Sequence, residues 1–152
     1  MKNRSNDPQA RAILKGGSAA PELRGEALFF PKRTGVLVVV RVCGLPEENA
    51  DGFFALHIHE GDSCAEDFSE TGGHYNPDSI PHPRHAGDLP PLLSCGGKAY
   101  LAVWTDRFSV SQILGRTVII HDGPDDFTSQ PAGNAGTKIA CGIIRKAENK
   151  PF

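Results

Sequence analysis

The sequence predicts an all-β sandwich or barrel. Three observations favour this fold class: apolar residues alternate with polar ones or form short runs, glycine and proline separate these runs, and no long helical pattern is present. The chain has 152 residues, with 17 glycines and 12 prolines, which suits one domain rich in turns. Several short strands with such punctuation are typical of sandwiches and barrels.

The individual strands follow from the same pattern. Val36–Val40 is rich in β-branched residues, which suit a pleated and half-buried surface. Ser109–Leu114 is compatible with a single helical turn. The predicted strands are Ala12–Lys15, Gly25–Phe30, Val36–Cys43, Gly52–His59, Lys98–Thr105, Thr117–His121 and Lys138–Ile144.

Composition and charge exclude several classes of protein. The net charge of −2, from 16 basic and 18 acidic residues, argues against a nucleic-acid or membrane-surface partner, since both usually need a basic excess. No apolar run is long enough to span a bilayer. The polar start of the chain shows no signal peptide, so the expected location is cytoplasmic, or extracytoplasmic if an upstream leader was removed. We expect a flexible segment at 1–10, one domain at 11–147 and a tail at 148–152.

Two segments interrupt the strand pattern, at 60–97 and 122–137. A stretch as long as the first is unusual in a compact domain unless it is functional or cross-linked. Metal ions and a disulfide are therefore expected to order it in place of regular secondary structure. It contains Cys64, His74, His82, His85 and Asp88.

The six histidines are the main candidates for chemistry. His57 and His59 lie two apart in a predicted strand, so both rings point to one face, although a lone pair of this kind is as compatible with chance. His121 ends an apolar run and begins a loop, a common place for functional residues. In the long loop, three imidazoles and one carboxylate form a complete donor set for zinc, the alternative being a solvated polar loop. That set is His74, His82, His85 and Asp88.

The number of donors suggests a shared ligand. Two sites with four ligands each need eight donors, and these residues supply seven. An imidazole has two nitrogens and, as imidazolate, can bridge two metals. One shared histidine would complete both sites.

Several motifs resemble those of the copper/zinc superoxide dismutases, in matching order and over nearly the whole chain. The resemblance implies an eight-stranded Greek-key β-barrel with long metal-binding and electrostatic loops. It also implies that superoxide is converted to dioxygen and hydrogen peroxide by alternate reduction and oxidation of copper, with zinc in a structural role. The motifs are Gly52–Glu60, Gly73–Pro77, His85–Leu89 and Gly133–Gly142, with weaker support from Gly115–His121.

The resemblance also assigns roles to residues. His74 would bridge the two metals, and Asp125 would link ligands of both sites, although alone it would pass for a solvated acidic turn. Cys64 and Cys141 match the family disulfide. The implied copper ligands are His57, His59, His74 and His121, and the implied zinc ligands are His74, His82, His85 and Asp88.

The chain departs from the family pattern at three places. Lys138 stands where the family usually has an arginine near copper, and it keeps the charge but loses the planar donor fork. We expect it to act with His74 in catalysis, the alternative being an ordinary surface lysine. Only two residues separate His82 from His85, which would change the zinc geometry. Cys43 and Cys95 would form a second disulfide or remain free and buried.

The resemblance leaves the assembly and the activity open. A homodimer is the usual family assembly, and a monomer is the other possibility. A copper-delivery protein or zinc-stabilised binding module on the same fold would lack dismutase activity. A zinc-only structural site is a further alternative, because imidazole binds both metals.

Overall fold

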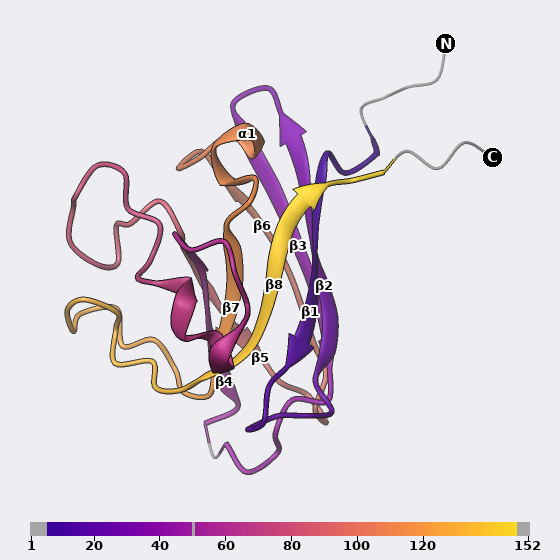
Figure 1. The fold of residues 1–152 in the computed structure, drawn as a ribbon, viewed down its shortest axis with the longest axis vertical. Helices are drawn as coiled ribbons and strands as arrows, with labels where there is room; N and C mark the ends of the chain where they lie inside the picture. The colour runs from indigo at the N-terminus through magenta and orange to yellow at the C-terminus, as the bar shows by residue number, and fades with distance from the viewer. Residues whose placement is uncertain (1–5, 50, 149–152) are drawn as a thin grey trace.

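Eight antiparallel strands build the molecule (Figure 1). The computed structural model describes residues 6–49 and 51–148. Within them the strands form one sheet that curls into a nearly closed barrel, which confirms the predicted fold class. The strands are β1 (Ala10–Gly16), β2 (Arg24–Lys32), β3 (Gly35–Cys43), β4 (Phe53–His59), β5 (Asp88–Leu93), β6 (Ala99–Thr105), β7 (Thr117–His121) and β8 (Lys138–Lys146).

The strand order has Greek-key connections. The order across the sheet is β5-β4-β7-β8-β1-β2-β3-β6, so β6 pairs with β3 and β7 lies between β4 and β8. The two end strands, β5 and β6, lie against each other and nearly close the barrel. This order places β4, β7 and β8, which come from distant parts of the sequence, side by side.

The prediction that 60–97 lacks regular structure is wrong for two stretches. A short 3-10 helix, η2, spans Glu66–Thr71, and β5 spans Asp88–Leu93. β5 was not predicted because it contains Pro90 and Pro91. Proline has no N–H to donate to a neighbouring strand, so within sheets it is found mainly in edge strands. β5 is such an edge strand. The predicted helical turn is confirmed as α1 (Val110–Ile113), capped by Ser109.

Alternating side chains fill the barrel. Along β1 and β3 every second residue is buried, and this period directs one face of each strand inward. A fully buried aliphatic or aromatic side chain contributes about 1.5 to 3 kcal/mol relative to an exposed one, so the barrel interior supplies most of the stability. The largest fully buried side chains include Leu14, Phe29, Phe54, Ile58, Leu92, Ile120 and Ile144.

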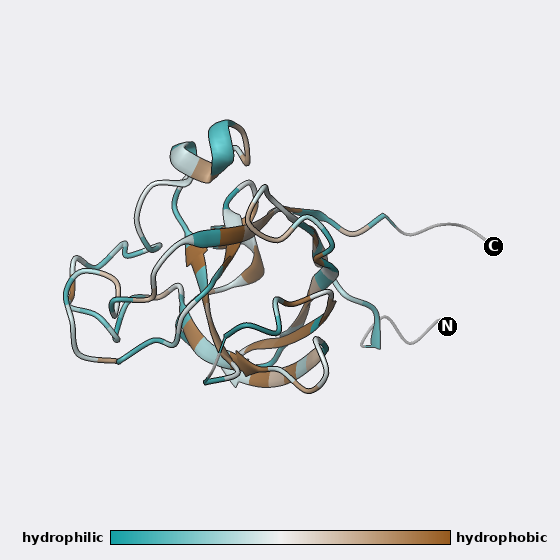
Figure 2. Cartoon of the chain, turned by 90° about the horizontal axis from the view of Figure 1, so that it is seen from below, coloured by the Kyte–Doolittle hydropathy of each residue, from teal (hydrophilic) through white to brown (hydrophobic). Residues whose placement is uncertain are grey.

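Two long loops leave the same side of the barrel. Residues 60–87 follow β4 and residues 122–137 follow β7, and both views place them together on the left (Figures 1 and 2). Figure 2 shows that they are more hydrophilic than the strands. Within the described part of the chain, no helix is long and apolar enough to cross a bilayer. Of the expected flexible ends, residues 1–5 and 149–152 lie outside the described residues.

A cluster of three charges lies on the outer face of the sheet. Glu26 on β2 contacts Arg11 on β1, with Oε2 2.6 Å from Nη2, and Arg41 on β3. Partial burial raises the pKa of Glu26, but the two guanidinium groups outweigh it and hold the pKa below 4.5. The cluster therefore joins three adjacent strands through the ionised form of Glu26.

We expect Glu26→Gln to lower the free energy of unfolding of the metal-free protein at pH 7 by about 1 kcal/mol. Because the folded-state pKa is lowered, this stabilisation is complete above the unfolded value near 4.5 and is lost as the pH falls through the folded-state value. Urea unfolding at pH 7 and in acid measures the difference, with the exposed Glu22→Gln as control. If the free energies of unfolding of the parent and Glu26→Gln differ by the same amount at both pH values, the stabilisation is not ionic.

Candidate metal centre

Three of the predicted copper ligands are carried by two adjacent strands. His57 and His59 lie on β4, and β7, which pairs with β4, ends at His121. An antiparallel bridge between His59 and His74 brings a fourth ring from the loop. One nitrogen of each ring lies within 4.8 Å of the other three, and all four residues are buried. We call these residues the four-histidine cluster.

A second cluster forms where the long loop enters β5. We call it the mixed cluster, and its members are His74, His82, His85 and Asp88. Asp88 Oδ1 lies 2.7 Å from His74 Nδ1, and Asp88 Oδ2 lies 3.0 Å from His82 Nδ1. The short spacing between His82 and His85 still lets both rings reach the cluster, and His82 is only 3% exposed. His74 belongs to both clusters, as the donor count suggests.

The protonation of two facing histidines indicates a site for a cation. Nδ1 of His59 donates to the Gly72 carbonyl at 2.8 Å, and Nδ1 of His121 donates to the Gly136 carbonyl at 3.2 Å. Each Nε2 therefore carries a lone pair, and the two Nε2 atoms lie 3.3 Å apart. Burial lowers the pKa of His59 to about 2 and of His121 to about 3. A bound cation, and not a proton, would therefore relieve this repulsion.

Asp125 links the two clusters from the loop that follows β7. Its carboxylate accepts hydrogen bonds from Nε2 of His57 and Nε2 of His82, both at 2.8 Å. Burial opposes its ionisation, but these bonds and the Phe127 N–H hold the pKa of Asp125 well below its usual range. Gly133, with φ +68°, packs against this carboxylate, where a Cβ atom would overlap Oδ1. Asp125 thus contacts one residue of each cluster, in agreement with the linking role that the sequence resemblance assigns to it.

Three buried ring nitrogens lack any hydrogen-bond partner among the described residues. They are Nδ1 of His57, Nε2 of His74 and Nδ1 of His82, the last of which lies 3.0 Å from Asp88 Oδ2 but not in hydrogen-bond geometry. Unpaired buried nitrogens are rare in proteins, and all three belong to the clusters. Three imidazoles with one carboxylate suit tetrahedral zinc, and four imidazoles suit copper. The residues present therefore fit the two metals of the sequence prediction.

Lys138 places a positive charge beside the four-histidine cluster. It pairs with His121 across β7 and β8. Its ammonium donates to Thr71 Oγ1 at 2.7 Å and to the Gly72 carbonyl at 3.2 Å, the same carbonyl that accepts from His59. Partial burial lowers the pKa of Lys138. These contacts argue against an ordinary surface lysine.

Two residues that support the site were not predicted from the sequence. Thr71 holds Lys138, as above, and Gln130 joins the two long loops. The Gln130 side chain accepts from the His82 N–H at 2.9 Å and donates to the His82 carbonyl at 2.7 Å. No motif marks either residue, because these contacts arise only when distant segments meet.

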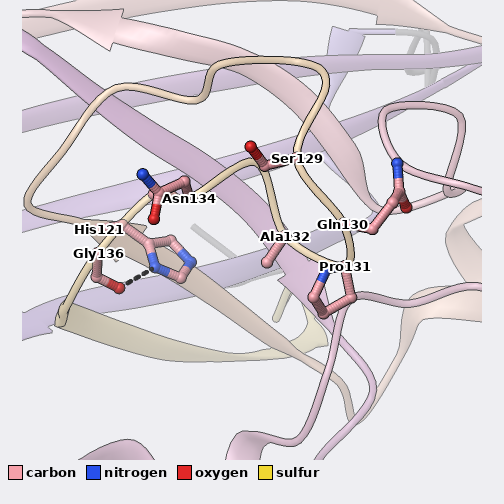
Figure 3. A pocket seen from close by; sticks show the side chains of 8 residues that line it. His121, Ser129, Gln130, Pro131, Ala132, Asn134 and Gly136 are labelled. Carbon is pink, nitrogen blue, oxygen red and sulfur yellow. Dashed lines mark hydrogen bonds between the residues drawn. The ribbon is translucent and has the colours of Figure 1, made fainter.

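A cavity opens beside His121. It measures about 290 Å³ and is bounded mainly by residues 129–136 of the loop that follows β7. Figure 3 shows the His121 ring beneath this loop, bonded to the Gly136 carbonyl, with Asn134 and Ser129 nearby. The lining contains amide, hydroxyl and carbonyl groups and no acidic or basic side chain other than the His121 ring. A small polar molecule can therefore approach His121, the one member of the four-histidine cluster that lines the cavity.

The predicted disulfide is confirmed. Cys64 and Cys141 are bonded, which ties the loop after β4 to the middle of β8 across 77 positions of sequence. The bond packs against Phe68 of η2 and Ile119 of β7. It therefore fixes the helix that carries Thr71 close to the strand that carries Lys138.

The second disulfide is absent, and Cys43 and Cys95 are free thiols, as the alternative held, but they are exposed and not buried. The turns that follow the two cysteines do lie together, with the Leu45 N–H bonded to the Gly97 carbonyl. The backbone of Lys98 pairs with that of Cys95 in an isolated antiparallel bridge. The β3–β6 register, continued by one residue beyond Val42 and Ala99, pairs Lys98 with Cys43 on the opposite side, so Lys98 lies between the two cysteines. Two ladder spacings give about 10 Å between the Cα atoms, beyond the limit of about 7 Å for a disulfide.

Comparison with known proteins agrees with this geometry. Residues 23–144 match the family model described as Copper/zinc superoxide dismutase (SODC). Superoxide dismutase (Cu-Zn) 2 of Aquifex aeolicus (strain VF5) is 37% identical over 157 residues, covering 93% of this chain and 89% of the relative. Superoxide dismutase (Cu-Zn) of Deinococcus radiodurans is 33% identical over 161 residues, covering 91% and 85%.

A further relative is named as a copper chaperone and not as a dismutase. The Copper chaperone for superoxide dismutase of Rattus norvegicus is 30% identical over 162 residues, covering 90% of this chain but only 59% of the relative. The family model matches well over half of the chain. On these grounds, together with the barrel and the two histidine clusters that share His74, the chain belongs to the copper/zinc superoxide dismutase family.

Proposed function

We propose that this chain is a superoxide dismutase, which converts two superoxide anions and two protons into dioxygen and hydrogen peroxide. The observation that carries the proposal is the shared ring of His74. Its Nδ1 contacts Asp88 and His85 in the mixed cluster, which leaves the unpaired Nε2 for the four-histidine cluster. The chain thus supplies all seven donors that two adjacent metal ions require.

The four-histidine cluster would hold copper and the mixed cluster would hold zinc. When bound, copper supplies one-electron exchange with superoxide, whereas zinc has no redox chemistry and orders the loop. Copper prefers an all-nitrogen donor set, and three imidazoles with a carboxylate are a standard set for tetrahedral zinc. The assignment of each metal to its cluster follows from these preferences.

The residues around the clusters orient the ligands and move the proton. Asp125 accepts a hydrogen bond from His57 and another from His82, which fixes both rings with Nδ1 free to bind metal. Nε2 of His74 has no hydrogen-bond partner, and whenever it is not bound to the metal of the four-histidine cluster it is the atom that can carry a proton toward the product peroxide. Lys138 would attract the anionic substrate toward the four-histidine cluster.

Metal analysis combined with a superoxide disproportionation assay tests the proposal. We expect purified protein supplied with both metals to hold about one copper and one zinc per chain, as two four-donor sites require. It should then disproportionate superoxide, and removal of copper should abolish the activity. Protein that binds only zinc, in both clusters, would contradict the proposal and favour a structural site.

Copper delivery is the second candidate, because a copper chaperone is among the relatives. A delivery protein needs to bind copper and release it to a target, but it needs no cation that attracts an anionic substrate. Lys138 beside His121 therefore favours the enzyme. Copper-loaded protein that is inactive in the assay would favour delivery.

We expect Lys138→Arg to raise the rate of superoxide disproportionation about two- to tenfold. Arginine has five N–H donors in a plane, so it can keep bonds to Thr71 and Gly72 and still direct a pair of donors toward a small anion. Pulse radiolysis of the metal-loaded proteins measures the rate constant. The neutral Lys138→Met serves as the opposite control and should be slower than the parent. An unchanged or lower rate for the arginine variant would refute the prediction.

A further inference from the structure

The ammonium of Lys138 lies in a cradle of three oxygen acceptors. Nζ is 2.7 Å from Thr71 Oγ1, 3.2 Å from the Gly72 carbonyl and 3.5 Å from the Phe68 carbonyl. An ammonium has three N–H donors, so this cradle can use all of them. All three acceptors come from η2 and the residue after it. The shortest contact, and the only one to a side chain, is to Thr71.

The hydroxyl of Thr71 is oriented to accept. Thr71 is completely buried, and its single hydroxyl hydrogen is donated to the Phe68 carbonyl at 2.8 Å. The lone pairs of Oγ1 are then available to the Lys138 ammonium. A buried hydroxyl with its hydrogen already committed is a fixed acceptor, and hydrogen bonds to charged groups are the stronger ones.

The cradle keeps the charge at one place relative to the four-histidine cluster. Its Gly72 carbonyl also accepts from His59, and Lys138 pairs with His121 in the sheet. On the far side, Phe68 packs against the disulfide between Cys64 and Cys141. The helix η2 is therefore anchored to the disulfide through the side chain of Phe68 and bonded to the lysine through its backbone and Thr71.

We propose that Thr71 is a positioning residue for anion attraction: its hydroxyl holds the Lys138 ammonium beside His59 and His121. The inference rests on the proposed function, because it assumes that Lys138 attracts the substrate anion. Without the hydroxyl, the lysine chain would swing into solvent, where its charge is screened and farther from the cluster. Thr71 itself would touch neither substrate nor metal.

Azide, a small monoanion, serves as the probe of the copper- and zinc-loaded protein, and its affinity is read from the absorption change on titration. We expect Thr71→Val to weaken azide binding about fivefold. The substitution removes the hydrogen bond between Thr71 and the Lys138 ammonium, and it acts on the anion only through the position of that ammonium. Thr71→Ser, which restores a hydroxyl, should recover most of the affinity. Thr117→Val is the matched control, because Thr117 is equally buried and its Oγ1 has no partner among the described residues.

A double-mutant cycle separates positioning from a general structural effect. In a Lys138→Met background, Thr71→Val should leave azide affinity unchanged, because no ammonium remains to be placed. A fivefold loss in that background, or an unchanged or tighter affinity in the single variant, would overturn the inference. If Lys138→Met alone leaves azide affinity unchanged, the role of Lys138 in the proposed function fails first.

A measurement on the parent protein avoids any folding defect in the valine variant. In the diamagnetic copper(I) and zinc form, NMR should detect Lys138 Nζ protons that exchange slowly with water, because all three are bonded. Rapidly exchanging protons, as on an exposed lysine, would overturn the inference. Exposed lysines of the same chain, such as Lys32, provide the internal reference.

Discussion

His74→Ala is expected to lower superoxide disproportionation at least 100-fold, and to lower the content of both metals. His74 is the only residue that belongs to both donor clusters, so its loss removes one ligand from each site. It also removes Nε2, which has no other partner and is the proposed proton carrier. No neighbouring side chain can replace a ring that contacts both clusters.

Metal analysis of the purified variants distinguishes this shared role from a single-site role. His85→Ala is the matched control, because His85 belongs only to the mixed cluster. It should lose mainly zinc and keep copper, whereas His74→Ala should lose affinity for both metals. Both rings are buried, so general destabilisation acts on both variants alike. A His74 variant that keeps copper and full activity would contradict the shared ligand and with it the proposed mechanism.

The strands were predictable because the barrel imposes a simple period on the sequence. Each of the seven predicted strands coincides with an observed strand, since one face of each must be apolar to fill the interior. β5 was not predicted, because an edge strand needs hydrogen bonds on only one side and therefore tolerates Pro90 and Pro91, which do not look like part of a strand in the sequence. Its place in the fold is visible only once β4 is present to pair with it.

The residues of the two candidate metal clusters were predictable for a different reason. Histidine and aspartate are the residue types that metals need, so their number and concentration in one loop carry information without any knowledge of the fold. Thr71 and Gln130 carry no such mark, because threonine and glutamine are common in solvated loops. Their roles depend on the paths of two loops that meet far from each other in sequence. The supporting residues of such a site are therefore harder to predict than its ligands.

Cys43 and Cys95 show how far spacing can mislead. Both precede turns that do lie together, as predicted, but the pairing of two thiols depends on a difference of a few ångströms in Cα separation. The ladder register, with Lys98 between them, decides against the bond. Register within a sheet is set by contacts along whole strands and cannot be obtained from two cysteines alone.

The disulfide between Cys64 and Cys141 is expected to contribute about 4 kcal/mol to the free energy of unfolding of the metal-free protein. It closes a loop with a sequence separation of 77, and the chain entropy that it removes from the unfolded state grows with the logarithm of that length. The double variant Cys64→Ser with Cys141→Ser should therefore unfold at a markedly lower guanidinium concentration. Cys43→Ser and Cys95→Ser are matched controls at exposed free thiols and should change stability by less than about 0.5 kcal/mol.

The same double variant should also bind azide more weakly when loaded with copper and zinc. The disulfide packs against Phe68, whose carbonyl belongs to the cradle of Lys138, so its loss frees η2 as well as the loop. Stability and anion affinity should then fall together in this variant, whereas Thr71→Val should mainly lower affinity. If removal of the disulfide lowers stability but leaves azide affinity unchanged, the cradle holds its shape without the cross-link. In that case the 60–87 loop owes its order to the mixed cluster and to Gln130.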